Sequence, residues 1–307
     1  MASITRFLFI FICLFSLKVM AEDADRKWVV AFAQDTLKND FRKAQVLEAR
    51  AEAGKHANIK FLFSDAEGKT SLLIRQINQF IKKKVDALIV GTNDEHAVVP
   101  VIKKAHKAGI RVIILDRGVS TTDYTSFINS DNLQIGAIGA EYVAKRLNGR
   151  GLVLLFEGLQ SADVTRLRSK GFNDVMARFP GIKVIKRTGN YLRKDALIEM
   201  EKLMSQGIKV DAIFAESDSM LSGARVVLKR HGVKLESLIS VGCDYISEAR
   251  DAIRKGTQSA SVLFPLGGKE SMQVALKALS GNKVPKHIVI PVKLITRDIA
   301  DDVPPIF

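Results

Sequence analysis

The sequence predicts an α/β protein with two similar lobes, each built on a doubly wound parallel sheet. Three observations point to this class. From Lys27 onward, short apolar runs alternate with amphipathic stretches, which is the pattern of repeating strand–helix units. A polar break at residues 121–131 divides these units into two consecutive series. The chain of 307 residues is also long enough for two domains of ordinary size.

The first series contains four predicted strands. The clearest is residues 111–118, RVIILDRG, where a fully apolar, β-branched run between two glycines is typical of a buried parallel strand. This run ends in an adjacent acid and base, Asp116 and Arg117. The other strands are predicted at 28–33, 59–64 and 85–90, and the helices at 41–56, 70–83 and 95–108. Four parallel strands with intervening helices make one doubly wound sheet.

The second series begins after residues 121–131, a segment with no predicted helix of its own. Its strands are predicted at 151–156, 182–187, 210–215, 238–242, 259–264 and 288–295. Its helices are predicted at 133–147, 163–179, 194–204, 217–231, 247–254 and 266–279, before a short polar tail. Because both series alternate in the same way, we expect two lobes of similar architecture rather than an array of short repeats.

Residues 1–21 predict a secretory signal peptide. Arg6 precedes an apolar run at 7–17, and Val19 and Ala21 supply the small or aliphatic residues of a cleavage site after Ala21. The run is short for a membrane span, so an uncleaved anchor is the weaker alternative. Cys13 lacks the small residues that precede a lipoprotein cysteine. We therefore expect a soluble, exported protein.

The chain is strongly basic, with a formal net charge of +14. An exported protein does not meet a genome, and the basic residues are dispersed over predicted helix faces, so no nucleic-acid partner is expected. Solvated helix faces, a membrane surface, an acidic partner or an anionic ligand are all consistent with the charge. Only Cys243 remains after signal cleavage, and the histidines show no metal-ligand spacing, so neither a disulfide nor a metal or other cofactor is expected.

Polar side chains follow nearly every predicted strand. Ligands of open α/β sheets bind beyond the carboxyl ends of the strands, so these side chains are well placed to meet one. Carboxylates and guanidinium groups suit a polyhydroxylated ligand, because each hydroxyl is both donor and acceptor, and aromatic rings cover the apolar faces of a sugar. Simpler roles compete: Asp94, Ser217 and Asp218 are also natural helix N-caps, and Asp116 with Arg117 could be an ion pair alone.

Catalysis is the weaker interpretation of these residues. The sequence has no phosphate loop, no Gly-x-Ser-x-Gly elbow, no HExxH motif and no paired cysteines. Asp116 and Asp244 could act as the acid and base of a glycosidase, but neighbouring guanidinium groups would hold both carboxyls ionised. We therefore expect a protein that is not an enzyme.

Several segments resemble periplasmic sugar-binding proteins of the ribose and galactofuranose type, in the right order over nearly the whole mature chain. They are VAFAQDTLKNDFRKA, VDALIVGTNDEHAV, AGIRVIILDRG, SFINSDNLQIGAIGAEYVAKRL, SADVTRLRSKGFNDVM, AIFAESDSMLSGA and SVGCDYISEARDAIRKG. The resemblance implies a type I periplasmic binding protein that is monomeric, has two lobes joined by a three-segment hinge, and hands its ligand to an ABC transporter. It places the crossings near 129–131, 264–265 and 290–292, the N-terminal lobe at 22–129 plus 265–290, and the C-terminal lobe at 130–264 plus 291–307.

The resemblance also implies a ligand site. It carries over to Asp35, Asn39, Phe41 and Arg42 in the first loop, to Asp116 and Arg117 for ring and anomeric hydroxyls, and to Arg168, Tyr191, Ser217, Asp244 and Phe264 elsewhere. Ser217 and Phe264 stand where the ribose-type pattern has side-chain amides, and Cys243 replaces an aromatic residue. A lost amide leaves a buried hydroxyl without its donor, at about 1–3 kcal/mol, so these changes argue against ribose. Arg42 replaces a loop aromatic and agrees better with the galactofuranose branch.

Three other functions share parts of this pattern. A ligand-sensing receptor read by a membrane sensor kinase or chemoreceptor would use the same trap. A transcriptional repressor shares the core but needs a helix-turn-helix before it, where this chain has its signal. A glycoside hydrolase would need turnover that depends on Asp116 and Asp244.

Overall fold

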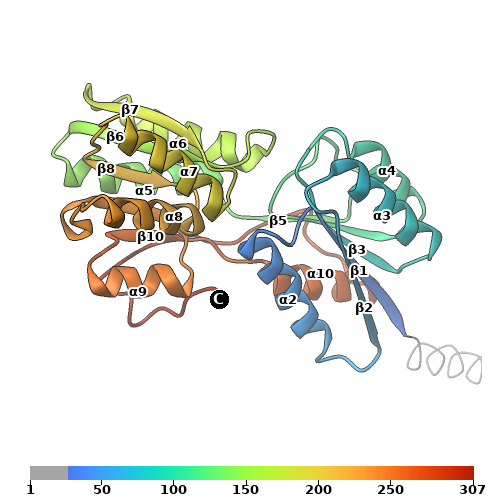
Figure 1. Cartoon of the computed structure of the whole chain (residues 1–307). Helices are drawn as coiled ribbons and strands as arrows, with labels where there is room; N and C mark the ends of the chain where they lie inside the picture. The colour runs from blue at the N-terminus through green and yellow to red at the C-terminus, as the bar shows by residue number, and fades with distance from the viewer. Residues whose placement is uncertain (1–26) are drawn as a thin grey trace, which may run out of the picture.

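Two six-stranded sheets, one in each lobe, organise the part of the chain that the computed structural model describes, residues 27–307. The predicted signal peptide at 1–21 lies outside the described residues. Figure 1 shows the two lobes side by side, with the chain passing between them near β5. Within residues 27–307, no helix is both long enough and apolar enough to cross a membrane.

The first sheet has the strand order β11-β5-β4-β3-β1-β2, and all of its strands are parallel. Its strands are β1 (Trp28–Gln34), β2 (Ile59–Asp65), β3 (Ala87–Gly91), β4 (Arg111–Leu115), β5 (Ser126–Asn129) and β11 (His287–Val289). Its helices are α2 (Asp40–Ala53), α3 (Thr70–Lys82), α4 (Val99–Lys107) and α10 (Gly268–Leu279).

Alternate residues of β1 pack on opposite faces of this sheet. Val30 and Phe32 belong to the apolar cluster formed with α2 and α10, whereas Ala31 and Ala33 belong to the cluster formed with α3 and α4. A strand whose side chains point alternately to two covered faces must be apolar throughout, which explains its continuous apolar run. Figure 1 shows the two helix pairs on opposite sides of the sheet.

The second sheet has the order β12-β10-β9-β8-β6-β7 and is parallel except for β12, which pairs antiparallel with β10. Its strands are β6 (Arg150–Glu157), β7 (Gly181–Thr188), β8 (Ala212–Ala215), β9 (Ile239–Asp244), β10 (Ala260–Leu263) and β12 (Lys293–Thr296). Its helices are α5 (Asn132–Arg146), α6 (Asp163–Met176), α7 (Arg193–Ser205), α8 (Asp218–Arg230) and α9 (Ser247–Lys255), with a short 3₁₀ turn at Leu235–Ser237. One face packs on α5 and α6, and the other on α7 and α8. The predicted class, two mostly parallel doubly wound sheets, is therefore confirmed.

The chain passes from one sheet to the other three times. It leaves the first sheet after β5, returns to it after β10 with α10 and β11, and leaves again after β11 to form β12. The single strand predicted at 288–295 is therefore wrong, because residues 290–292 separate two strands of different sheets. The polar break predicted at 121–131 contains the short strand β5, which its mixed polar and apolar composition concealed.

The helix predicted at 95–108 begins later, at Val99. The Asp94 carboxylate accepts hydrogen bonds from the backbone N–H groups of His96 and Ala97 and so holds a turn before the helix. Pro100 follows in the first helical turn, where a missing N–H is tolerated. The interpretation of Asp94 as a helix N-cap is therefore wrong: the N-cap of α4 is Val98, and Asp94 holds the turn that precedes it.

Candidate ligand-binding site

The carboxyl ends of the two sheets meet at one narrow cavity of about 20 Å³. This is room for about one water molecule, so the two walls are in near contact. The first lobe contributes the loops after β1 and β4 and the first turn of α2. The second contributes α6, the loops after β7 and β8, and the ends of β9 and β10. The residues that line the cavity are Asn39, Phe41, Arg42, Asp116, Arg117, Val164, Arg168, Tyr191, Ser217, Asp244 and Phe264.

Ten of the eleven residues that the sequence singled out line this cavity, and Asp35 lies directly behind it. The Asp35 carboxylate is 3.0 Å from Nη1 of Arg117 and 3.4 Å from Nε of Arg42, so two guanidinium groups stand between it and the opening. Sequence reasoning missed Val164, in the first turn of α6, although it stands in the stretch SADVTRLR that carried part of the resemblance.

The first-lobe wall is a network of paired charges. Nη1 of Arg42 is 2.9 Å from Oδ2 of Asp116, and the Arg42 side chain is only 1% exposed. Arg42 also donates to Oε1 of Gln45 and to the Thr92 carbonyl. Every guanidinium of this wall therefore has a carboxylate within ion-pair distance, as a buried charge requires.

The second-lobe wall carries a guanidinium without such a partner. Arg168 donates from Nε to Oδ1 of Asn132 at 2.8 Å and from Nη1 to the carbonyl of Glu216 at 2.6 Å. Within residues 27–307, no carboxylate oxygen lies within 4.0 Å of this guanidinium. The central carbon of the Arg168 guanidinium, Cζ, stands 4.5 Å from the centre of the Phe264 ring. One face of the same Phe264 ring stacks with Phe41 at 4.9 Å, so a cation and two rings form one continuous surface.

Two residues of this wall have left-handed backbone conformations. Tyr191 has φ of 61° and follows Asn190 at 52°, while Asp244 has φ of 108° and precedes Tyr245 at 64°. Non-glycine residues rarely adopt these angles, and they persist where the surrounding structure holds them. The Asp218 carboxylate holds the second turn by accepting a hydrogen bond from the Tyr245 N–H at 2.7 Å. Burial raises the pKa of Asp244 well above its ordinary value.

The Tyr191 ring lies over Gly158. A Cβ atom at position 158 would stand 1.9 Å from the ring, so only glycine leaves room for it. The phenol group is 2.8 Å from Oγ1 of Thr165 and 3.3 Å from Oε2 of Glu216. On the opposite side, the Arg117 guanidinium of the first lobe stands 5.5 Å from the ring centre.

Four polar contacts hold the two lobes together across the cavity. Asn39, which also caps the N-terminus of α2, donates from Nδ2 to the Tyr191 carbonyl at 2.8 Å. The other three involve the N-terminal region of α6: Ser161 donates to the Asn93 carbonyl, Asp163 accepts from the Gly118 N–H, and Arg166 pairs with Glu95. The structure is therefore that of a closed cleft.

Two polar atoms of the first wall have no hydrogen-bond partner among the described residues. They are Oδ1 of Asp116 and Nε of Arg117, an acceptor and a donor in adjacent residues. Burying such atoms unpaired costs about 1–3 kcal/mol each, so a ligand hydroxyl that met both would remove this penalty.

Ser217 and Cys243 have structural roles as well. The Ser217 hydroxyl accepts from the Met220 N–H and caps α8, which confirms its interpretation as an N-cap, and the residue also lines the cavity. Cys243 is a free, fully buried thiol in the apolar cluster of Phe41 and Phe264, which confirms its interpretation as a packed residue. Within residues 27–307, no cluster of three or more His, Cys, Asp or Glu side chains could hold a metal ion.

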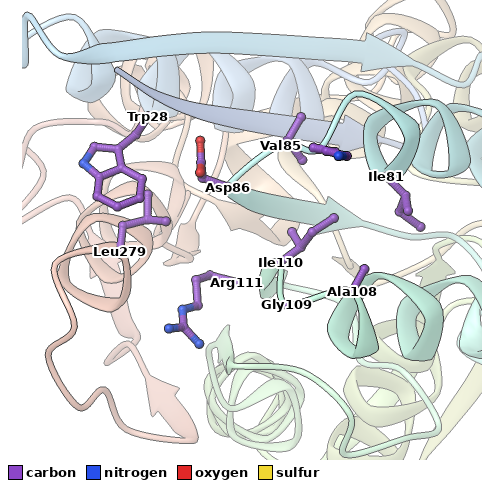
Figure 2. Close-up of a pocket in the computed structure, with 10 residues that line it drawn as sticks. Trp28, Ile81, Val85, Asp86, Ala108, Gly109, Ile110, Arg111 and Leu279 are labelled. Atoms are coloured by element: carbon purple, nitrogen blue, oxygen red, sulfur yellow. The ribbon is translucent and has the colours of Figure 1, made fainter. Parts of the chain in front are cut away.

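A larger pocket of the described chain lies away from this cleft. Figure 2 shows this pocket of about 540 Å³, lined by Trp28, Asp86, Arg111 and Leu279 among others. Trp28 and Arg111 begin β1 and β4, so the pocket lies at the amino ends of the strands. Ligands of open α/β sheets bind at the other end of the strands, and this pocket is therefore separate from the candidate site.

Two lobes closed on a cavity at the carboxyl ends of their strands define a ligand-binding protein of the hinged, two-lobed class. The family model for the periplasmic binding protein domain matches residues 30–283, which is most of the chain. The chain belongs to this family. The membership confirms the predicted family and fold, and it confirms that the protein binds a solute and is not an enzyme.

The chain also matches individual relatives over most of their length. The chain is 32% identical to a putative rhizopine-binding protein of Rhizobium meliloti over 231 residues, covering 72% of this chain and 75% of the relative. It is 27% identical to the ribose import binding protein of Bacillus subtilis, covering 89% and 88%. A solved ABC transporter solute-binding protein of Bacillus halodurans, with bound myo-inositol, superposes with a TM-score of 0.85 at 27% identity, covering 91% and 97%.

Proposed function

We propose that this protein captures a neutral monosaccharide or cyclic polyol between its lobes and delivers it to an ABC transporter in the membrane. The observation that carries the proposal is an unused acceptor and an unused donor on the first-lobe wall, facing a second wall that also carries polar groups. Oδ1 of Asp116 and Nε of Arg117 face inward from one lobe, and Asp244 lines the cavity beside Arg168 from the other. Hydroxyl groups, which donate and accept at once, satisfy both kinds of atom.

The charges of the cavity favour a neutral ligand over an anionic one. Arg42 and Arg117 are already compensated by Asp35 and Asp116. The remaining cation, Arg168, shares the cavity with Asp244, so a ligand carboxylate would meet a carboxyl group as well as a guanidinium. The stacked rings of Phe41 and Phe264 offer a surface for the apolar C–H face of a sugar ring.

Binding would require the cleft to open and close. A cavity of about 20 Å³ cannot admit a sugar, so the ligand would enter an open form and the lobes would rotate about the segments between β5 and α5, β10 and α10, and β11 and β12. We propose that the lobes that move are 22–129 plus 265–290 and 130–264 plus 291–307. A ligand favours the closed form only through contacts it makes better there, which contacts to both walls would provide.

The printed names of the relatives support the class of ligand and the partner. They include ribose import, a putative rhizopine-binding protein and a solute-binding protein with bound myo-inositol. We propose that Asp35, Asn39, Phe41, Arg42, Asp116, Arg117, Arg168, Tyr191, Ser217, Asp244 and Phe264 make up the site. Export by a signal peptide cleaved after Ala21 would place the protein in the periplasm, where we propose that it acts as a monomer.

A thermal-shift panel tests this proposal. The panel comprises D-ribose, L-arabinose, D-galactose, myo-inositol and glycerol, with D-galacturonate as the anionic comparison. A ligand at 100 times its dissociation constant adds about 2.7 kcal/mol to the free energy of unfolding, which shifts the melting temperature by several degrees. Stabilisation by a neutral member is expected. Stabilisation by galacturonate alone would overturn the neutral-ligand proposal, and no response to any member would count against sugar binding.

A further inference from the structure

Glu216 is a buried carboxyl group that does not line the cavity but stands directly behind it. It directly follows the last residue of β8 and is fully buried. Its Oε2 accepts from the Gly158 N–H at 2.9 Å, and its Oε1 is 2.8 Å from the Ser169 hydroxyl oxygen. The same Ser169 oxygen is 2.8 Å from Oε1 of Glu157, so one hydroxyl connects two carboxyl groups.

A count of protons around Ser169 shows that one of these carboxyl groups is protonated. A hydroxyl carries a single proton and donates it to one acceptor, so the second oxygen–oxygen contact needs a proton from its own carboxyl group. Glu157 is 13% exposed and lies 3.1 Å from the Lys186 ammonium, whereas among residues 27–307 Glu216 has no ion pair with a lysine or arginine. The proton therefore belongs on Glu216.

The hydrogen bonds of Tyr191 connect its ring to the same carboxyl group. Thr165 donates its hydroxyl proton to the Leu159 carbonyl at 2.8 Å, so its oxygen is left to accept from the Tyr191 phenol. The phenol oxygen is also 3.3 Å from Oε2 of Glu216, the oxygen that accepts from the Gly158 N–H. With the proton on Oε1, Oε2 faces the phenol as a neutral carbonyl oxygen, whereas an ionised Glu216 would present a charged oxygen that competes with Thr165 for the phenol proton.

We infer that Glu216 is held as a neutral acid and, in that form, is a positioning residue that fixes Tyr191 against the cavity. The inference rests on the proposed function, because it assigns a role at the same site. Tyr191 joins both lobes: its carbonyl accepts from Asn39, and its ring faces Arg117. Ionising Glu216 would draw the phenol proton away from Thr165 and would set two negative carboxylates on either side of Ser169.

The surroundings of Glu216 agree with this state. The pKa of Glu216 is raised to about 7: burial is the largest cause and the Glu157 carboxylate adds to it, while the Gly158 N–H, Arg168 and Ser169 act in the opposite direction. Two other titratable side chains surround Glu216: Tyr191 from the loop after β7 and Cys243 from β9. Burial raises the pKa of both groups. Arg117 of the first lobe faces the Tyr191 ring.

Carbon-13 NMR of the ligand-free mature chain, labelled at glutamate carboxyl and tyrosine ring positions, tests the inference. Glu216→Gln identifies the Glu216 resonance by its loss. We expect that resonance to titrate near pH 7 and the Tyr191 ring resonances to move with the same midpoint. In Glu216→Gln, a neutral isostere that can accept from Gly158 and donate to Ser169, the Tyr191 resonances should stay constant from pH 5 to 9.

Two further variants keep the inference falsifiable. Glu157→Gln should lower the Glu216 midpoint by removing a neighbouring negative charge, whereas Glu48→Gln, a partly buried carboxyl on α2, should leave it unchanged. A Glu216 midpoint near 4.5, or a Tyr191 response that persists in Glu216→Gln, would overturn the inference. No ligand is used, so failure here leaves the sugar panel to decide the proposed function separately.

Discussion

The two walls of the cleft solve the problem of buried charge in different ways. On the first-lobe wall, Arg42 and Arg117 each lie within 3.0 Å of a carboxylate oxygen of Asp116 or Asp35. On the second-lobe wall, Arg168 is held by carbonyl and amide oxygens and by a phenylalanine ring. The first wall thus pairs its charges without ligand and leaves only Oδ1 of Asp116 and Nε of Arg117 without a hydrogen bond, whereas no carboxylate of residues 27–307 forms an ion pair with Arg168 on the second. This difference indicates that the first wall is preformed and that the second gains most from a ligand.

The largest expected effect is on the stability of the first wall. Arg42→Ala would leave Asp35 and Asp116 with fewer charge partners in a buried site, and breaking a buried pair costs about 3–5 kcal/mol. We expect a loss of that size in the free energy of unfolding, measured by urea denaturation without ligand. A loss below 1 kcal/mol would mean that water already compensates these carboxylates and that the first wall is not preformed.

Arg168→Met is the matched change on the second wall. Methionine keeps the apolar stem against Phe264, and no bare carboxylate is created, because burial already raises the pKa of Asp244 and lets it take a proton. The Asn132 amide oxygen and the Glu216 carbonyl oxygen lose their donor, at about 1–3 kcal/mol each, so we expect the ligand-free protein to lose about 2–6 kcal/mol. The stabilisation by a saturating sugar, about 2.7 kcal/mol at 100 times the dissociation constant, should disappear from the thermal-shift assay.

Gly158→Ala tests whether the space left by Gly158 positions the Tyr191 ring on the second wall. The new methyl group would overlap the tyrosine ring, and overpacking of this kind costs about 1–3 kcal/mol. Because the ring can move only by leaving its place over the cavity, we expect weaker ligand binding by calorimetry along with a lower melting temperature. The substitution Gly207→Ala serves as a control for general damage, since its added Cβ meets no atom within 4 Å. Its φ of +69° gives a conformational cost without displacing Tyr191.

The smallest effect is expected at the rim, where the walls touch without enclosing the cavity. Arg166 and Glu95 form a 2.5 Å pair between the lobes, with the arginine 54% exposed. Exposed pairs contribute about 0–1 kcal/mol and are screened by salt. Arg166→Ala should therefore shift ligand affinity less than fivefold, and 0.5 M NaCl should abolish the difference. A larger, salt-resistant effect would show that the rim rather than the walls governs closure.

Much of this site could be predicted from the sequence because its residues follow strands directly. Asp116, Arg117 and Asp244 are placed by the strand ends alone, since the carboxyl ends of parallel strands share one edge. Val164 could not be predicted in this way, because a residue in the first helical turn reaches the cavity only at one angle between the lobes. Asp35 does not line the cavity, because its carboxylate forms ion pairs with Arg42 and Arg117 and lies behind their guanidinium groups. Such competition among charges depends on three-dimensional distances that no strand pattern contains.

The role of Glu216 could not be predicted from the sequence either. Its position after β8 was visible among the strand-end residues, but its contacts come from Gly158, Ser169 and Tyr191 on three other segments. The strand β5 and the division of residues 287–296 into two strands also depend on which sheet receives each short run. Short runs carry little periodicity, so tertiary pairing decides their structure.

The late return of the chain to the first sheet has a consequence for the order of events during biosynthesis. Helix α10 and strand β11 complete the first lobe, yet they are encoded after almost the whole second lobe. A growing chain that has emerged only as far as residue 260 still exposes the apolar faces of α2 and β4 that α10 covers. The first lobe therefore cannot complete its packing until most of the last fifty residues have been synthesised.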